Sequence, residues 1–330
     1  MKRRAAIVGI AVLAAAASRV MAQSGKIPRV GVLHAGSSNE SPTIQREPFE
    51  RGLREQGWVP GSNVLIDYKY AEGNAGRLDE LAAALIRSGV DVIVARAPAA
   101  INAARRATAT IPIVMSAGTD DPVAGGLVKS LSQPGGNVTG ILTLIWELDK
   151  KRLELLKEAF PGISRVAVLA NPDFDRGRYA KHVAALHDSG RSLKLQLQIF
   201  EVRRADEIAV AFTAIGQRQA EALLVQGDPQ VLDHNRSEIV AMAAQHRLPA
   251  VYPWHFFAEA GGLMSYGTSF SAFHHRAATY VSRILRGAKA GELPIEQPSK
   301  YELVVNVGAA KAQGLTIPQS VLFRADRLIP

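Results

Sequence analysis

Several charged side chains come directly after predicted strands, where they could bind a small charged molecule. Arg96 follows the apolar residues 92–95, and Asp120 and Asp121 follow the apolar run 111–115. A guanidinium can bind a carboxylate, and a carboxylate can bind an amine. If Arg96 faces a cleft, it is therefore the natural partner for a carboxylate, and Asp120 or Asp121 could bind an amine. Arg96 could instead extend its guanidinium to solvent, so both orientations stay open at this point.

Four aromatic residues lie on or beside the loops that follow predicted strands, although aromatic residues make up only 6% of the chain. They are Phe174, Tyr252, Trp254 and Tyr266. Flat rings at such positions could enclose an apolar or aromatic ligand and still offer the polar edge of Tyr or Trp. An equally good alternative is that Tyr252 and Trp254 pack beneath the helix that follows them.

Catalytic motifs are missing from the sequence. It contains no GxSxG elbow, GxxxxGK phosphate loop, GxGxxG fingerprint or HExxH zinc helix. His274 and His275 are adjacent, so on a helix they point in different directions and cannot share a metal as an i, i+4 pair would. With no cysteine, thiol catalysis is excluded as well. The sequence therefore predicts a protein that is not an enzyme and has no cofactor or metal; a hydrolase is the weaker hypothesis.

Two similar α/β halves must position these residues. The first opens with RVGVL at 29–33 and the second with RVAVL at 165–169, on either side of a turn-rich stretch at 133–156. Each half alternates apolar strands with amphipathic helices, a pattern typical of parallel sheets with helices on both faces. Ligands of such sheets lie outside the carboxyl ends of the strands. The predicted fold is thus two Rossmann-like lobes with a ligand cleft between them.

The individual elements follow from periodicity and from Pro and Gly positions. Asp121 and Asp228, each before a proline, are typical of helix N-caps, and for Asp228 capping is the favoured interpretation over ligand contact. The charged run 149–154 is typical of a solvated helix face. The predicted strands are 29–33, 64–70, 91–95, 111–115, 137–141, 166–170, 193–202, 222–226, 249–252, 262–265 and 301–305; the helices are 47–56, 76–88, 98–106, 178–189, 205–216, 231–246 and 272–285.

The first residues predict export. A basic start at Lys2, Arg3 and Arg4 precedes an apolar run at 5–17, and small residues before Gln23 predict a signal peptide, residues 1–22, cleaved after Ala22. The apolar run is shorter than the roughly 20 residues that a membrane span needs. The absence of cysteine excludes a lipid anchor and disulfides. We therefore expect a periplasmic protein that meets no nucleic acid and does not itself span the membrane.

The net charge of +9 includes four basic residues of the predicted signal, so the mature chain carries +5. Its remaining basic residues are interspersed with acidic ones, which again does not indicate a nucleic-acid surface.

Ordered blocks along the whole mature chain resemble the ABC transporter substrate-binding proteins of the tryptophan/tyrosine type. The blocks include FERGLREQGW at 49–58, QPGGNVTG at 133–140, RVAVLANP at 165–172, AGGLMSYG at 260–267 and QPSKYELVVN at 297–306. The resemblance implies a type I periplasmic binding fold, with two lobes joined by a three-segment hinge. It places the N-terminal lobe at 28–142 plus 267–297 and the C-terminal lobe at 143–266 plus 298–330. It also implies a small-molecule ligand and an ABC permease of the inner membrane as partners.

Ligand contacts are implied by the same resemblance, position by position. They fall on Ser41 and Thr43 of the loop 37–43, on Ala97, Pro98 and Ala99, and on Asp121, Asn171, Asp228 and Tyr252. The chain departs from the family pattern at Arg96, where small Gly or Thr residues are common, and at Asp120, which adds a second acid beside Asp121.

Two functions share this fold and this export. The leading hypothesis is the periplasmic solute-binding component of an ABC importer, which closes on an amino acid or aromatic carboxylate. The alternative is a sensory receptor whose closed lobes signal to a membrane kinase. A cytoplasmic repressor is excluded by the signal peptide and by the lack of an N-terminal DNA-binding helix pair. A monomer is expected, because one cleft per chain suffices.

Overall fold

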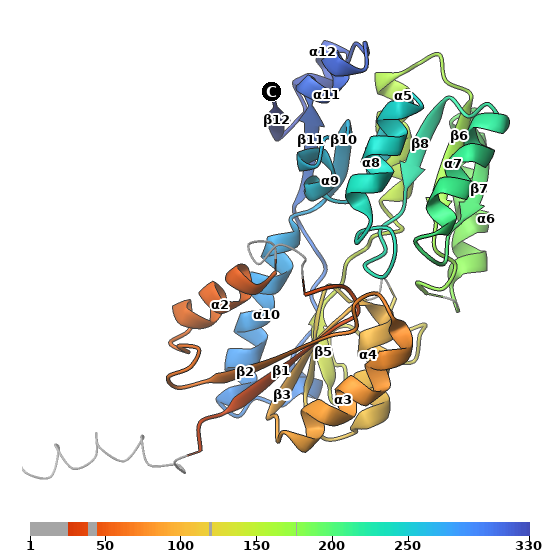
Figure 1. The fold of residues 1–330 in the computed structure, drawn as a ribbon. Helices are drawn as coiled ribbons and strands as arrows, with labels where there is room; N and C mark the ends of the chain where they lie inside the picture. The colour runs from red at the N-terminus through yellow and green to blue at the C-terminus, as the bar shows by residue number, and fades with distance from the viewer. Residues whose placement is uncertain (1–25, 39–44, 119–120, 176) are drawn as a thin grey trace, which may run out of the picture.

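The computed structural model describes residues 26–38, 45–118, 121–175 and 177–330. The predicted signal peptide and the candidate residues Ser41, Thr43 and Asp120 lie outside these described residues. The chain forms two α/β lobes, each built around its own mostly parallel sheet (Figure 1). The predicted fold class is therefore confirmed.

The first lobe contains a five-stranded parallel sheet in the order β2-β1-β3-β4-β5. Helices α3 and α4 cover one face of this sheet, and α2 and α10 cover the other. The central strands are buried along their whole length because both faces are covered. The elements are β1 (Arg29–His34), α2 (Arg46–Glu55), β2 (Leu65–Tyr70), η1 (Ala75–Arg77), α3 (Leu78–Arg87), β3 (Val92–Arg96), α4 (Ala97–Ala107), β4 (Ile113–Ser116), β5 (Val138–Ile141), α10 (Phe270–Leu285) and η2 (Ala290–Glu292).

The second lobe contains a seven-stranded sheet in the order β12-β11-β10-β9-β8-β6-β7, in which only the pair of β10 and β11 is antiparallel. Helices α5 and α6 contribute to the core on one face, and α7, α8 and α9 to the core on the other. The elements are α5 (Asp149–Ala159), β6 (Arg165–Ala170), α6 (Tyr179–Ser192), β7 (Gln196–Glu201), α7 (Glu207–Gln217), β8 (Ala222–Val225), α8 (Arg236–Gln245), β9 (Ala250–Tyr252), α9 (His255–Glu259), β10 (Met264–Thr268), β11 (Tyr301–Asn306), α11 (Val307–Ala312), α12 (Gln319–Leu322) and β12 (Arg327–Ile329).

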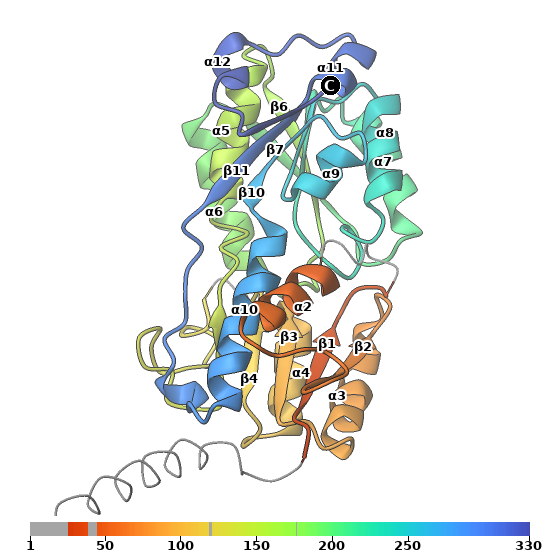
Figure 2. The ribbon, with the colours of Figure 1, turned by 90° about the vertical axis from the view of Figure 1, so that its left-hand side faces the viewer.

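The chain passes between the lobes at three places: after β5, between β10 and α10, and between η2 and β11. Figure 2 shows α10 in the first lobe although β10, directly before it, belongs to the second. The predicted lobe limits near residues 142, 266 and 297 fall in or beside these passages. The limits themselves stay a prediction.

One predicted helix is absent, and another begins later than predicted. No helix follows Asp121 and Pro122, where the structure has turns; the Asp121 carboxylate still caps one of them, because its Oδ1 accepts from Ala124 N at 2.9 Å. Gly126, with a φ of +63°, interrupts any helix there. The helix predicted at 231–246 begins only at Arg236, as α8, because the preceding residues form turns.

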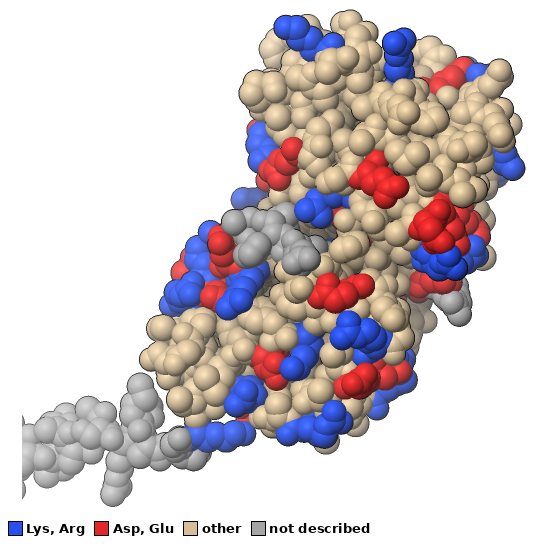
Figure 3. Space-filling view, viewed as in Figure 1, with Lys and Arg blue, Asp and Glu red and all other residues tan. Residues whose placement is uncertain are grey.

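Charged residues are spread over both lobes, with acidic and basic side chains interspersed on the face shown in Figure 3. Many of them form ion pairs on the surface, for example Arg106 with Asp79 and Arg324 with Glu158. Such mixed surfaces favour solubility in water and do not create a large region of one sign of charge.

Within the described ranges, no helix combines the length and the apolar character needed to cross a bilayer.

Candidate binding site between the lobes

Arg96 ends β3 and lies in the junction between the lobes, where its side chain is only 4% exposed. Of the two orientations left open by the sequence, the structure therefore has the one that faces inward. The next residue, Ala97, adopts a φ of +70°, and Ala117 across from it adopts +93°. The Ala97 N–H donates to Ala117 O at 3.1 Å. Non-glycine residues in this region of φ are strained and cluster at functional sites.

Groups from both lobes surround the Arg96 guanidinium. Its Nη1 lies 2.8 Å from His34 Nε2, and its Cζ lies 4.3 Å from the centre of the Phe270 ring. Its Nη2 lies 3.4 Å from Asp233 Oδ2, which belongs to the second lobe. The Asp233 side chain is 2% exposed, so this ion pair is buried between the lobes.

The two histidines beside Arg96 are neutral. Burial, followed by the charge of Arg96, lowers the pKa of His274 to about 3. Burial and the same guanidinium also hold the pKa of His34 well below its ordinary value. Burial disfavours the charged form of an imidazole, and a nearby cation disfavours it further. Arg96 is therefore a positive charge among neutral rings, with Asp233 as its partner.

Asp228 stabilises its own loop, whereas Asp233 pairs with Arg96 of the other lobe. Its carboxylate accepts from the backbone N–H groups of Gln230, Val231 and Leu232 and from Asn171 Nδ2, at 2.9 to 3.2 Å. Burial raises the pKa of Asp228 in spite of these bonds. The carboxylate thus holds the loop after β8 in shape. This is the capping chemistry expected from the sequence, although a turn rather than α8 is capped.

A small cavity of about 10 Å³ lies where the lobes meet, and its lining includes Arg96, Ala97, Thr143, Phe174, Asp233 and Trp254. This volume corresponds to about one water molecule. A larger solute enters only if the lobes separate or the lining side chains move.

Trp254 gives this cavity a second buried donor. Its side chain is 3% exposed, and its Nε1 has no hydrogen-bond partner among the described residues. The indole meets the Phe270 ring edge to face, with 5.1 Å between ring centroids. A buried N–H group without a partner is costly and is normally satisfied by an acceptor. A carboxylate beside Arg96 would supply that acceptor.

The structure brings together some of the expected site residues but not all. Arg96, Ala97, Phe174 and Trp254 line the cavity. Tyr252 is 1% exposed and stacks on Phe257 of α9 at 5.0 Å, which is the alternative left open by the sequence: it packs beneath the following helix. The other described candidates lie outside the cavity lining: Pro98 and Ala99 in the first turn of α4, Asp121 and Asn171 in their loops, Asp228 in its own turn, and Tyr266 stacked on Tyr301 at 6.1 Å.

A buried ion pair lies beside the passages between the lobes, where the sequence predicted a solvated helix face. That interpretation is wrong for Asp149 and Arg152 of α5, which are both fully buried and 2.6 Å apart between Oδ1 and Nη1. Arg152 also donates to Ile145 O at 2.7 Å and to Tyr266 O at 2.8 Å. These two carbonyls lie in or beside two different passages. Arg152 therefore fixes their positions relative to each other.

Two further polar residues complete this cluster. Gln226 Nε2 donates to Asp149 Oδ2 at 3.0 Å and lies 2.6 Å from His182 Nε2. The His182 ring stacks on Trp146 at 4.3 Å. Sequence reasoning missed the whole cluster, because a charged helix residue gives the same pattern whether it faces solvent or a buried partner.

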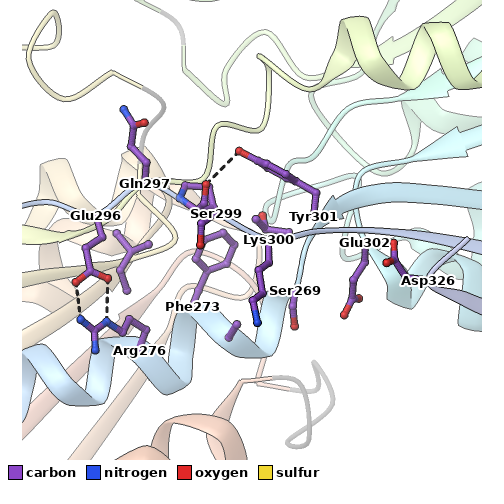
Figure 4. Close-up of a pocket in the computed structure, with 14 residues that line it drawn as sticks. Ser269, Phe273, Arg276, Glu296, Gln297, Ser299, Lys300, Tyr301, Glu302 and Asp326 are labelled. Carbon is purple, nitrogen blue, oxygen red and sulfur yellow. Dashed lines mark hydrogen bonds and ion pairs between the residues drawn. The ribbon is translucent and has the colours of Figure 1, made fainter. Parts of the chain in front are cut away.

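A groove of about 870 Å³ lies at the passage from η2 to β11, outside the Arg96 cavity (Figure 4). At one end, Arg276 and Glu296 form a two-bond ion pair at 2.6 and 2.8 Å. The groove is larger than the Arg96 cavity but open to solvent. The cavity is the better candidate, because buried charges from both lobes converge on it. No cluster of three or more metal-ligating side chains occurs in the described part of the chain.

Comparison with known proteins gives relatives of one kind. A "Tyrosine-binding protein" of Clostridioides difficile is 26% identical over 275 residues, which is 83% of this chain and 78% of that protein. A conserved domain protein from Vibrio cholerae has a TM-score of 0.84 and 29% identity, covering 92% of this chain and all of that one. An ABC domain from Streptococcus pneumonia in complex with L-Trp has a TM-score of 0.82 and 26% identity, with the same coverage.

The family model described as ABC transporter substrate binding protein matches residues 31–329, almost the whole chain. Proteins of this family bind a small molecule, and the family implies a permease as partner. With the two-lobed fold and the buried charges at the lobe junction, this match assigns the chain: it belongs to the ABC transporter substrate-binding protein family.

Proposed function

We propose that this protein is the solute-binding component of an ABC importer and that it binds an amino acid or aromatic carboxylate between its lobes. The observation that carries the proposal is the Arg96 guanidinium, buried at the lobe junction in the lining of the same cavity as Trp254, whose N–H has no partner among the described residues. Two buried donors in the lining of one cavity shielded from water suit a carboxylate. The printed names of two relatives, a tyrosine-binding protein and an L-Trp complex, support a ligand of this kind.

Lobe closure is the mechanism that we propose. Arg96 comes from the first lobe, and Trp254 and Phe174 from the second. A ligand that touches both lobes binds the closed state more tightly than the open state, and it shifts the population by that difference in affinity. The ligand then reaches the permease with its bonds unchanged.

Isothermal titration calorimetry of protein stripped of ligand tests the proposal. The panel consists of the twenty amino acids and a set of aromatic carboxylates. We expect at least one binder, and we expect Arg96→Ala to weaken its binding by about 100-fold, since a buried charge-assisted contact is lost. Arg106→Ala is the matched control, because Arg106 is an exposed residue in the last turn of α4, at the opposite end of the helix from Arg96. Unchanged binding by Arg96→Ala would remove Arg96 from the site.

Export to the periplasm, cleavage after Ala22 and a monomeric state belong to the same proposal. The intact mass of the protein purified from a periplasmic fraction tests the cleavage position, and light scattering tests the monomer. Mass spectrometry of the solute after incubation with the protein tests whether its bonds stay unchanged. Recovery of a modified solute would favour an enzyme instead.

A further inference from the structure

Asp233 lies on the opposite side of the junction from Arg96 and is held in place independently of it. Its Oδ1 accepts from Asp228 N at 3.3 Å, and its backbone N–H donates to Asp228 O at 2.8 Å. The Asp228 carboxylate in turn fixes the loop through three backbone N–H groups. Asp233 Oδ2 is thereby directed at Arg96 Nη2, 3.4 Å away.

A ligand with only a negative charge meets an obstacle in this arrangement. Its carboxylate would compete with Asp233 for the guanidinium and place two carboxylates near one cation. Buried charges are costly unless each has a partner, and removing one partner of a buried pair is strongly unfavourable. Two like charges in one dry site disfavour each other as well. The Arg96–Asp233 pair therefore selects against monoanions.

A zwitterion does not meet this obstacle. In an α-amino acid, the carboxylate and the ammonium group are attached to the same carbon, so the two charges are close together. Inserted between the lobes, the carboxylate faces Arg96 and Trp254 Nε1, and the ammonium group faces Asp233. Each buried charge keeps a partner of opposite sign, and the net charge of the site does not change.

We infer that Asp233 is the specificity-determining residue of the cleft: it is the built-in counterion of Arg96, and it makes the site accept zwitterionic α-amino acids and reject carboxylic acids that lack the amine. This inference rests on the proposed function and adds to it. The sequence pointed to Asp120 or Asp121 for the amine; of these, Asp121 is used as a turn cap and does not line the cavity.

Matched ligands test the inference without any mutation. L-Tryptophan and L-tyrosine are each compared by calorimetry with the analogue in which hydrogen replaces the α-amino group, 3-(indol-3-yl)propionate and 3-(4-hydroxyphenyl)propionate. Ring and carboxylate are the same in each pair. We expect the amino acid to bind about 100-fold or more tightly than its analogue, the ratio that an unpaired buried charge produces. Equal affinities would overturn the inference and leave the proposed function intact, whereas no binding of any amino acid or acid in the panel would overturn both.

Asp233→Asn tests the residue itself. Asparagine keeps the shape and can still accept from Asp228 N, but its Nδ2 becomes a donor that favours a carboxylate over an ammonium group. We expect amino-acid binding to weaken and the preference over the analogue to fall by about 10-fold or more. Asp206→Asn, which removes an exposed carboxylate of the same lobe, should leave both affinities unchanged.

A different role for Asp233 predicts a different result. If Asp233 only holds the lobes together, Asp233→Asn weakens amino acid and analogue by the same factor, and the inference is wrong. Circular dichroism and the thermal midpoint establish that the variant is folded. If it does not fold, the matched ligands on the unmodified protein decide the question alone.

Discussion

Arg96 Nη2 and Asp233 Oδ2 lie 3.4 Å apart, although one residue ends a strand of the first lobe and the other follows a strand of the second. Both side chains are almost completely buried. Separation of the lobes must therefore break this ion pair and hydrate both groups. The free energy of this ion pair therefore contributes to the equilibrium between the closed and the open arrangement of the lobes.

Removing one member of the pair should favour the open arrangement. In Arg96→Met, Asp233 would be buried without this cation unless the lobes separate, so we expect a larger radius of gyration by small-angle scattering in the absence of ligand. The double variant Arg96→Met/Asp233→Leu buries no charge at these positions, and it should regain the compact form. Identical scattering from the unmodified protein, Arg96→Met and the double variant would show that the ion pair does not influence how far the lobes separate.

Arg152 should be essential for stability. In Arg152→Met the Asp149 carboxylate stays buried without its cation, and the carbonyls of Ile145 and Tyr266 each lose a donor. We expect a loss of about 3 to 5 kcal/mol in the free energy of unfolding, measured with urea.

Lys151→Met is the matched control for Arg152→Met, because Lys151 is the preceding residue of the same helix, is 41% exposed and pairs with Glu154. A surface pair of this kind contributes about 0.5 kcal/mol or less. Similar losses in both variants would show that burial of the Asp149–Arg152 pair is not what makes it important.

Most of the fold could be predicted from the sequence, because apolar runs bounded by Gly and Pro identify buried parallel strands. The rule that ligands lie beyond the carboxyl ends of strands led to Arg96, Phe174 and Trp254, and the structure brings these three to one cavity. The strand ends are fixed by local sequence, so their position in the fold follows from topology alone.

Asp233 could not be predicted in the same way. It lies within the range 231–246, where spacing indicated a helix, but the first part of this range is held in turns by the Asp228 carboxylate. Asp149 and Arg152 were likewise interpreted as a solvated face. In both cases the outcome depends on which side chains meet in three dimensions, and helical spacing carries no information about that.

Gly227 leaves no room for a side chain unless the Ile145 side chain moves. A Cβ at this position would overlap Ile145 Cδ1 and lie 3.2 Å from Trp254 Nε1. Gly227→Ala should therefore displace the buried Ile145 side chain and cost about 1 to 3 kcal/mol in the free energy of unfolding. The double variant Gly227→Ala/Ile145→Ala removes the overlapping atoms, and it should be less destabilised than the sum of the two single variants.

The control for Gly227→Ala is Gly162→Ala, where no atom lies within 4 Å of the added Cβ. This variant should unfold within about 0.5 kcal/mol of the unmodified protein. If Gly227→Ala were equally harmless, the Ile145 side chain would be free to move away from an added Cβ, and its packing would not restrict Gly227.

His274 should make the protein less stable in mild acid. Its pKa is about 3 in the folded protein, because it is buried next to Arg96, against an ordinary value of 6.5. Between these values the unfolded chain binds a proton that the folded protein does not bind. The contribution of His274 to the free energy of unfolding is therefore fully present above pH 6.5. It decreases as the pH is lowered from 6.5, and the decrease ends near pH 3.

Replacing His274 by leucine should remove this part of the acid sensitivity. The free energy of unfolding is measured with urea at pH 7 and at pH 5 for both proteins. We expect its decrease between these pH values to be smaller in His274→Leu than in the unmodified protein, by roughly 1 to 2 kcal/mol. His34, the other buried histidine beside Arg96, continues to contribute in the variant. His275→Leu changes the adjacent, partly exposed histidine and leaves His274 in place, so this variant should lose as much stability between pH 7 and pH 5 on account of His274 as the unmodified protein does. An unchanged pH dependence in His274→Leu would mean that His274 is protonated, and hence hydrated, in the folded protein at pH 5.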